Sequence, residues 1–351
     1  MPVRYGKKVP ADDLFKELAK RSGYPVSCMI NLTRRCNLRC RHCYQVKRGG
    51  KELTARQWSA ALRDLADTGV LLLTFSGGEP LVRKDFFSIA RAARKLHFSI
   101  RLKTNAWLLD EKKADFLADT GFEQVQISLY SLKPEAHDGI TGRKGSLDRV
   151  LRAARMLRER GVSVHLSMPM MDVNAAEIPR MAAFAGQEGF EYGVDPNLTV
   201  CEDGSCSPVS LRQSSESMVS IYGNAGFVDK RALRRAVRSR IKKPDEPVCG
   251  VGTSGIVIEP PGDVLPCVML NLPLGNIGRA RLKDIWDGNP LLKLVRGITW
   301  SDLHTCCDCD LRPWCTRCHG CALLEDGDLF GPSRLACEGA EARKTALEGK
   351  E

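Results

Sequence analysis

Three cysteines, Cys36, Cys40 and Cys43, lie in one short segment near the start of the chain. Four thiolates would complete a tetrahedral zinc site or serve all four irons of a cubane cluster. Three thiolates in one loop leave a position open, which a catalytic metal needs in order to bind a substrate. The spacing Cys-x3-Cys-x2-Cys lets one loop wrap around an iron–sulfur cubane. A structural zinc ion with a distant fourth ligand is the alternative.

A second group of cysteines occupies the last third of the chain. It comprises Cys249, Cys267, Cys306, Cys307, Cys309, Cys315, Cys318, Cys321 and Cys337. Within it, residues 306–318 read Cys-x2-Cys-x5-Cys-x2-Cys. This many cysteines at these spacings indicates bound metal, again with zinc as the alternative to iron–sulfur clusters. The whole chain has 15 cysteines, and in a reducing compartment clustered thiols serve metals or catalysis more often than disulfides.

The elements that must position the first cysteines alternate between strand and helix. Apolar runs predict strands at 26–32, 70–75, 99–104, 124–130, 162–168 and 192–196. Amphipathic patterns predict helices at 54–69, 85–96, 111–121, 146–161 and 175–189, the last despite Pro179. About six βα units imply a parallel sheet with helices outside. Six units are too few for a closed eightfold barrel, so we expect an α/β fold with a partial TIM-like barrel or an open sheet.

Polar motifs follow the ends of successive predicted strands. The cysteine loop follows the first strand, residues 76–80 (SGGEP) the second and residues 104–107 (TNAW) the third, while Ser128 and Tyr130 end the fourth. In parallel sheets and barrels the chemistry lies at the C-terminal ends of the strands. We therefore expect these motifs to converge on one rim.

The remainder of the chain differs in composition and in its predicted elements. Residues 201–215 are polar and rich in turn formers, which predicts a linker or lid, and a basic helix is expected at 230–243. Short strands at 255–260 and 264–270 flank a Pro-Gly-Asp turn, which is a hairpin signal. We divide the chain into an N-terminal arm (1–24), a partial barrel (25–200), a linker (201–243) and a small cysteine-rich C-terminal domain (244–351).

Charge and hydropathy limit the partners. The net charge of +11 comes from Lys and Arg scattered over predicted helices, which indicates solvated faces, with an acidic peptide or anionic cofactor as the next interpretation. We do not expect a nucleic-acid partner. No apolar run is long enough to span a membrane, and the N-terminus lacks the apolar segment of a signal peptide. We expect a cytoplasmic protein.

The segment CNLRCRHC (residues 36–43) resembles the signature loop of the radical S-adenosylmethionine enzymes. The resemblance implies that Cys36, Cys40 and Cys43 hold a [4Fe–4S] cluster whose open iron chelates S-adenosylmethionine. One electron from this cluster would cleave S-adenosylmethionine to a 5′-deoxyadenosyl radical that abstracts hydrogen. The family places an aromatic residue just before the last cysteine. Here His42 stands there and Tyr44 follows the cysteine, which would alter adenine packing.

Other motifs resemble cofactor-binding segments of the same family. The implied residues are Gly77, Gly78, Glu79, Thr104, Asn105 and Ser128. The glycines would let the backbone approach the ligand, and the Glu79 carboxylate would hold the ammonium group. Thr104, Asn105 and Ser128 would line the ribose side, with capping of strand ends as the alternative. Arg143 would reach the carboxylate of the cofactor, or else be a surface arginine.

The C-terminal cysteines resemble the SPASM extension, which carries two auxiliary iron–sulfur clusters. The resemblance implies ligands Cys249, Cys267 and Cys318 for the first cluster, and Cys306, Cys309, Cys315 and Cys337 for the second. The family spacing after the third cysteine of the repeat is x3, and here it is x2. The first cluster is one ligand short, so Cys321 or Cys307 completes it or the site stays open. Cys201 and Cys206 are interpreted as loop thiols, and Cys28 as core.

The SPASM group resembles peptide and protein maturases. We therefore expect hydrogen abstraction from a ribosomally synthesised peptide. An auxiliary cluster would accept the electron that is released when the product forms. Modification of a tetrapyrrole side chain, or a non-catalytic iron–sulfur or zinc-binding module, are the alternatives. About 24 residues precede the first strand, which predicts a separate small peptide-recognition protein. We also expect an electron donor such as flavodoxin or ferredoxin. Tyr130, Asp195 and Glu202 fall near the rim, but no catalytic acid or base is assigned.

Overall fold

A computed structural model describes residues 3–4, 11–46, 50–224, 226–228, 230–239 and 244–348. Parts of two expected segments lie outside the described residues. These are residues 1, 2 and 5–10 of the N-terminal arm and residues 240–243 of the basic helix.

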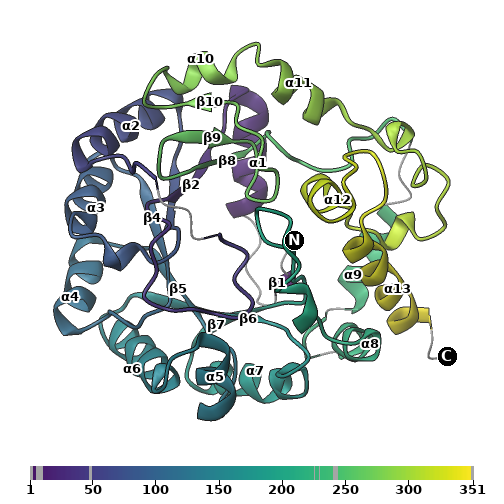
Figure 1. Ribbon diagram of the computed structural model, residues 1–351, viewed down its shortest axis with the longest axis horizontal. Helices are drawn as coiled ribbons and strands as arrows, with labels where there is room; N and C mark the ends of the chain where they lie inside the picture. The colour runs from purple at the N-terminus through teal and green to yellow at the C-terminus, as the bar shows by residue number, and fades with distance from the viewer. Residues whose placement is uncertain are drawn as a thin grey trace.

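Six parallel strands form the centre of the fold, and each pairs with the next one along the chain. They are β2 (Ser27–Asn31), β3 (Leu72–Ser76), β4 (Ser99–Thr104), β5 (Gln124–Ser128), β6 (Ser163–Pro169) and β7 (Glu191–Asp195). Figure 1 shows the strands curving inside a ring of helices. The predicted partial barrel is thereby confirmed.

The outer ring consists of the crossover helices between these strands. They are α2 (Ala55–Thr68), α3 (Phe86–Lys95), α4 (Glu111–Thr120), α5 (Pro134–Thr141), α6 (Ser146–Glu159) and α7 (Ile178–Gln187). Thr54 caps α2 by accepting from the Gln57 amide, and Gly69 ends the helix at φ 101°. Helix α7 follows a 3-10 turn at Ala175–Glu177. Pro179 therefore lies in its first turn, where a missing N–H costs no hydrogen bond.

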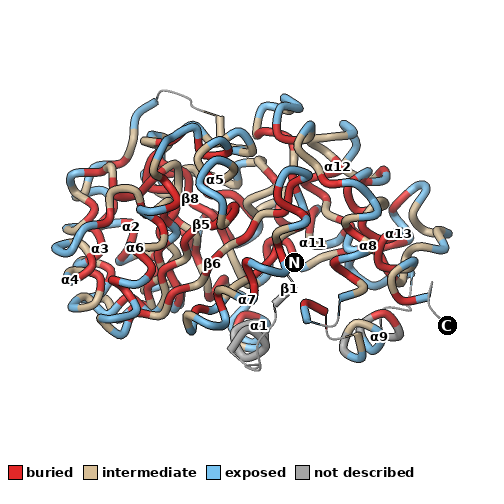
Figure 2. Tube along the Cα trace, turned by 90° about the horizontal axis from the view of Figure 1, so that it is seen from below, coloured by how far each residue is buried: buried red, intermediate tan, exposed pale blue. Residues whose placement is uncertain are grey.

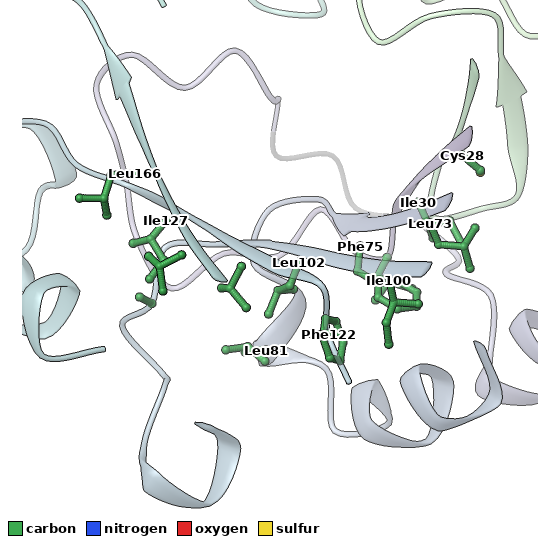
Figure 3. Packing of buried hydrophobic residues seen from close by; sticks show 14 of the residues in the cluster. Cys28, Ile30, Leu73, Phe75, Leu81, Ile100, Leu102, Phe122, Ile127 and Leu166 are labelled. Atoms are coloured by element: carbon green, nitrogen blue, oxygen red, sulfur yellow. The ribbon is translucent and has the colours of Figure 1, made fainter. Parts of the chain in front are cut away.

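The two faces of the barrel sheet differ in character. Phe75, Leu102, Ile127 and Leu166 are fully buried and point toward the helices, as Figure 3 shows. Residues at alternate positions face the other way, because side chains alternate along a strand. On that concave face lies the exposed Lys103, next to polar neighbours on β5 and β6. Closed barrels fill this interior with bulky apolar layers, so a polar interior indicates a face meant for ligands.

The sheet continues beyond the barrel strands at both edges. Strand β1 (Val3–Arg4) pairs antiparallel with β7. At the other edge β8 (Gly255–Ile258) pairs parallel with β2, followed by β9 (Asp263–Leu265) and β10 (Gly275–Asn276) in antiparallel order. The predicted hairpin around Gly262 is present as β8–β9. Three strands of the cysteine-rich region, β8, β9 and β10, thus belong to the same ten-stranded sheet as the barrel.

The remaining helices surround the C-terminal cysteines or lie near the barrel ends. They are α1 (Ala11–Ser22), α8 (Ser215–Gly223), α9 (Lys230–Ser239), α10 (Leu282–Trp286), α11 (Pro290–Gly297), α12 (His319–Asp326) and α13 (Arg334–Glu348). Helices α8, α12 and α13 form a lobe beside the open side of the barrel (Figure 1). A second buried cluster joins residues of α9 and α13 to Trp300 and Leu303, and Figure 2 shows buried residues running through both parts. Within the described ranges, no helix has both the length and the apolar content to cross a membrane.

Candidate functional site

The cysteine loop leaves β2 and lies directly on the SGGEP turn after β3. The amide of Gly78 donates to the Thr33 carbonyl at 2.7 Å, and that of Glu79 to the Arg35 carbonyl at 2.9 Å. A Cβ on Gly77 would stand 2.4 Å from the Thr33 oxygen, and one on Gly78 the same distance from the Arg35 oxygen. Gly77 also has φ 128°. The close approach that these glycines permit is therefore to the cysteine loop itself.

The end of α5 holds the same loop from another side. The amides of Arg39 and Arg41 donate to the carbonyls of Thr141 and Ile140 at 3.2 and 2.9 Å. Arg143 donates to the Asn37 carbonyl at 3.1 Å, and its guanidinium lies 4.0 Å from the centre of the Trp107 ring. Arg143 is exposed, as a surface arginine would be, and contacts both the loop and Trp107.

The structure brings the three thiols of this loop together. Burial, together with the smaller effect of the charges of Cys43 and Cys36, raises the pKa of Cys40 to about 12. The Leu38 amide and the Asn105 side chain donate to Cys36 Sγ at 3.4 and 3.6 Å. Such donors stabilise thiolate, the form that ligates metal. The loop therefore fits a cubane, in which each thiolate binds a different iron.

A single-ion site fits the chain less well. A zinc ion would need its ligands crowded around one point, with each sulfur about 2.3 Å from the metal. In the part of the chain that the structure describes, no three His, Cys, Asp or Glu side chains form such a group. The zinc alternative therefore has no geometric support from the described residues.

Glu79 is the buried acid of this site. Its carboxylate accepts from the Leu81 amide at 3.0 Å, the Thr104 hydroxyl at 2.8 Å and the Asn105 amide at 2.7 Å. Burial raises the pKa of Glu79 to about 7, although these three donors act in the opposite direction. A cation placed beside Glu79 would favour its charged form. Thr104 and Asn105, expected near a ribose, therefore also position Glu79.

Tyr130 lies beneath the cysteine loop, and its role could not be read from the sequence. It is buried, its hydroxyl donates to the Cys40 thiol, and Ser128 hydrogen-bonds that hydroxyl in turn. Its ring lies 4.7 Å from the His42 ring and 5.2 Å from that of His137, centre to centre. Ser128 is thereby connected to a cysteine of the loop through Tyr130.

The segment after β7 covers the cysteine loop. Cys201 is buried and its thiol lies 3.6 Å from the Cys43 carbonyl, whereas Cys206 is exposed. The Glu202 amide donates to the Tyr44 carbonyl at 3.0 Å. Arg34 bridges Glu202 and Glu259, each at 2.6 Å. The linker and the strand β8 region are therefore both tied to the loop.

The C-terminal cysteines lie in two groups. In the first, burial raises the pKa of Cys249 to about 11, and the charges of Cys318 and Cys267 add to the effect. Cys318 also interacts with Cys267. In the second group Cys315 interacts with Cys337 and Cys306, and Cys337 with Cys306 and Cys309. All fifteen cysteines are free, Cys28 among them in the core.

The two candidates for the missing ligand differ in position. The Cys321 thiol donates to Cys318 and holds the pKa of Cys318 below its ordinary value, at about 6. The Cys307 thiol instead points to the His304 carbonyl and the Asp308 carboxylate, each at 3.4 Å. Cys321 therefore lies with the first group, and Cys307 is directed away from it.

Family comparisons match both halves of this arrangement. The model of the radical SAM superfamily matches residues 30–185, which include the cysteine loop and Glu79. The SPASM model, an iron–sulfur cluster-binding domain, matches residues 249–322, from Cys249 to just beyond Cys321.

Individual proteins are similar over most of the chain. The PqqA peptide cyclase of Granulibacter bethesdensis is 29% identical over 326 residues, covering 88% of this chain and 87% of the relative. That of Xanthomonas campestris is also 29% identical, covering 91% and 88%. Among solved structures, Streptococcus suis SuiB bound to its precursor peptide SuiA has a TM-score of 0.71 at 17% identity, covering 94% and 82%. The structure of anSMEcpe with AdoMet and a Cp18Cys peptide gives 0.69 at 20% identity, covering 93% and 97%. These two structures share the fold.

Proposed function

Because this chain is a SPASM-containing radical S-adenosylmethionine enzyme, with a [4Fe–4S] cluster for S-adenosylmethionine and auxiliary iron–sulfur clusters, we propose that it modifies a ribosomally synthesised peptide. The observation that carries this proposal is the similarity to PqqA peptide cyclases, which extends over 88% of the chain. A relative that shared only the barrel would say nothing of the substrate class.

We assign Cys36, Cys40 and Cys43 to the cluster that binds S-adenosylmethionine. When bound, that cluster would supply one electron, which would cleave S-adenosylmethionine to methionine and a hydrogen-abstracting 5′-deoxyadenosyl radical. The buried Glu79 carboxylate would bind the ammonium group of S-adenosylmethionine, since a buried carboxylate is stabilised by an adjacent cation. Gly77 and Gly78 keep Glu79 against the cysteine loop. Thr104, Asn105 and Ser128 would line the remainder of the cofactor site.

For the auxiliary clusters we assign the two cysteine groups found together in the structure. Cys249, Cys267 and Cys318 would hold the first, with Cys321 as the fourth ligand because its thiol already contacts Cys318. Cys306, Cys309, Cys315 and Cys337 would hold the second. Hydrogen bonds and burial around such thiolates tune the potentials of the clusters.

The concave face of the barrel offers the place for a peptide side chain. Lys103 is exposed there, and its charge faces Asp195 at the end of β7. Surrounding protein atoms nonetheless lower the pKa of Lys103 by desolvation. A cation in such surroundings favours a carboxylate partner, which suits an acidic residue of a peptide.

The domain division at residues 24, 200 and 243, the separate small peptide-recognition protein and the flavodoxin or ferredoxin donor are part of the same proposal. The helical lobe and the linker lie beside the open side of the barrel (Figure 1), where a peptide would enter. A recognition protein would deliver the leader of the peptide to this side.

The test uses anaerobically reconstituted enzyme, S-adenosylmethionine and dithionite, with each short peptide encoded beside the gene. We expect 5′-deoxyadenosine and a mass change in one peptide, with greater yield when a small recognition protein encoded nearby is added. The Cys36, Cys40 and Cys43 triple-alanine variant should form neither product. 5′-Deoxyadenosine without a mass change in any peptide, together with turnover of a tetrapyrrole, would contradict the peptide assignment. Full modification by the enzyme alone would contradict the separate recognition protein.

A further inference from the structure

Three arginines of the described chain are buried, and two of them lie beside the C-terminal cysteines. They are Arg83, Arg317 and Arg343, exposed by only 6%, 3% and 7%. Arg83 pairs with the carboxylates of Asp85 and Glu52 at 2.7 and 3.4 Å. Among the described residues, neither Arg317 nor Arg343 has a carboxylate within ion-pair distance. This difference requires a physical explanation, because a buried guanidinium without a counter-charge is costly.

Arg317 lies at the point where the chain passes between the two auxiliary sites. It follows Cys315 of the second group by two residues and directly precedes Cys318 of the first. Its guanidinium donates to the carbonyls of Gly331 and Leu329 at 2.9 and 2.6 Å and to His319 Nδ1 at 2.7 Å.

The partners of Arg317 leave its charge uncompensated. The carbonyls are neutral, and the imidazole of His319 is neutral as well, because its Nδ1 accepts from the guanidinium and therefore carries no proton. The charge of the guanidinium acts on the thiols of Cys306 and Cys249. The groups near it that become anionic when they bind metal are thus cysteines of both sites.

Arg343 serves the second site alone. From helix α13 it donates to the Trp314 carbonyl at 2.7 Å and to the hydroxyls of Thr316 and Tyr222 at 3.2 and 3.1 Å. Trp314 and Thr316 flank Cys315 in the chain, and the charge of Arg343 reaches the Cys315 thiol. All three hydrogen-bond partners are neutral, so this cation also lacks compensation from the described protein.

We propose that Arg317 and Arg343 are the counter-charges of the auxiliary clusters, with Arg317 shared between the two sites and Arg343 acting on the second alone. A cluster held by thiolates carries net negative charge and gains one more on reduction. A nearby fixed cation therefore stabilises the reduced form more than the oxidised form and raises the reduction potential. Both arginines act on the second site, whereas only Arg317 acts on the first. The second cluster therefore has the higher reduction potential. An electron that enters at the first site then moves downhill to the second.

The experiment is a potentiometric titration of the reconstituted full-length holoenzyme, followed by electron paramagnetic resonance. Addition of S-adenosylmethionine changes the spectrum of the cluster that binds it and so identifies its signal. The signal that changes in Cys249→Ala belongs to the first auxiliary cluster. Arg317→Gln should shift the reduction equilibrium of both auxiliary clusters at least tenfold toward the oxidised form, about 59 mV for one electron. Arg343→Gln should shift that of the second cluster only. Arg317→Lys and Arg343→Lys should restore most of the potential.

Two further variants keep the test informative if a buried variant binds less iron. Glu341 is exposed on α13 and its charge reaches Cys337, so Glu341→Gln should raise the potential of the second cluster without disturbing the core. Lys112→Gln removes an exposed cation of α4, in the outer ring of the barrel, and should change neither potential.

The proposal is overturned if the first cluster is the more easily reduced in the wild type. It is also overturned if the glutamine variants load fully and leave both potentials unchanged, or if Glu341→Gln lowers the second potential. These potentials are measured without a peptide, so failure to find a peptide substrate leaves the result intact.

Discussion

Replacement of Gly78 by alanine would separate the SGGEP turn from the cysteine loop. The added Cβ would stand 2.4 Å from the Arg35 oxygen and 2.9 Å from the Arg34 oxygen, well inside the 3.4 Å at which ordinary contact begins. Both obstacles are backbone atoms and cannot rotate away. Overpacking of this kind costs roughly 1–3 kcal/mol. Weakening of the Gly78–Thr33 and Glu79–Arg35 hydrogen bonds adds about 1 kcal/mol each.

We therefore expect Gly78→Ala to lower the free energy of unfolding by roughly 3–5 kcal/mol in anaerobic urea titrations of the apoprotein. Iron bound by the cysteine loop and S-adenosylmethionine affinity should fall with it. Gly186→Ala is the matched control, because that glycine lies in α7 with open space around its Cβ position and should be neutral or slightly stabilising. Equal stability, iron content and S-adenosylmethionine affinity in Gly78→Ala and wild type would refute the reasoning.

Three other predictions follow from the site. Tyr130→Phe removes the donor to Cys40 and should lower the reduction potential of the cluster that binds S-adenosylmethionine. The control Tyr192→Phe should leave this potential unchanged. An unchanged potential in a Tyr130→Phe protein with its full iron content would count against the hydrogen bond. Cys321→Ala should reduce the iron content and change the Mössbauer spectrum of the first auxiliary site, and Cys307→Ala should do neither; the reverse pattern would exchange the two assignments. Between pH 4.5 and about 7 the folded chain keeps the proton of Glu79, whereas the unfolded chain releases it. The free energy of unfolding of the apoprotein should therefore fall across this range as pH rises, by roughly 3 kcal/mol relative to Glu79→Gln. Parallel pH profiles for the two proteins would contradict the raised pKa.

Most of the barrel could be predicted because each of its helices and strands is specified by a short, continuous segment of the sequence. Helix α2 has its cap at Thr54 and its stop at Gly69, and the strands are short apolar runs. Helix α5 was missed because its sequence, PEAHDGIT, has a glycine and a polar buried face. Its stability comes from contacts outside the helix, such as the Asp138 carboxylate, which accepts from the Gly145 amide and the Ser146 hydroxyl at 2.6 and 2.8 Å.

The parts of the site that escaped prediction depend on contacts distant in sequence. The pairing of β8 with β2 joins strands more than 200 residues apart and leaves no local signal. The cysteines were predictable because their spacing alone indicates metal. The environment of Tyr130, Arg317 and Arg343 was not, since only the folded chain shows that these polar side chains are buried and what they contact.

The ion network of Arg34 has a consequence for how the enzyme is made. Arg34, two residues before Cys36, is held by Glu202 and Glu259, which lie 168 and 225 residues further along the chain. On the ribosome the N-terminal strands emerge long before these carboxylates exist. Contacts of such separation form late in folding. The loop thus reaches its final position only when about three quarters of the polypeptide has been synthesised, and insertion of iron into a finished site belongs after translation.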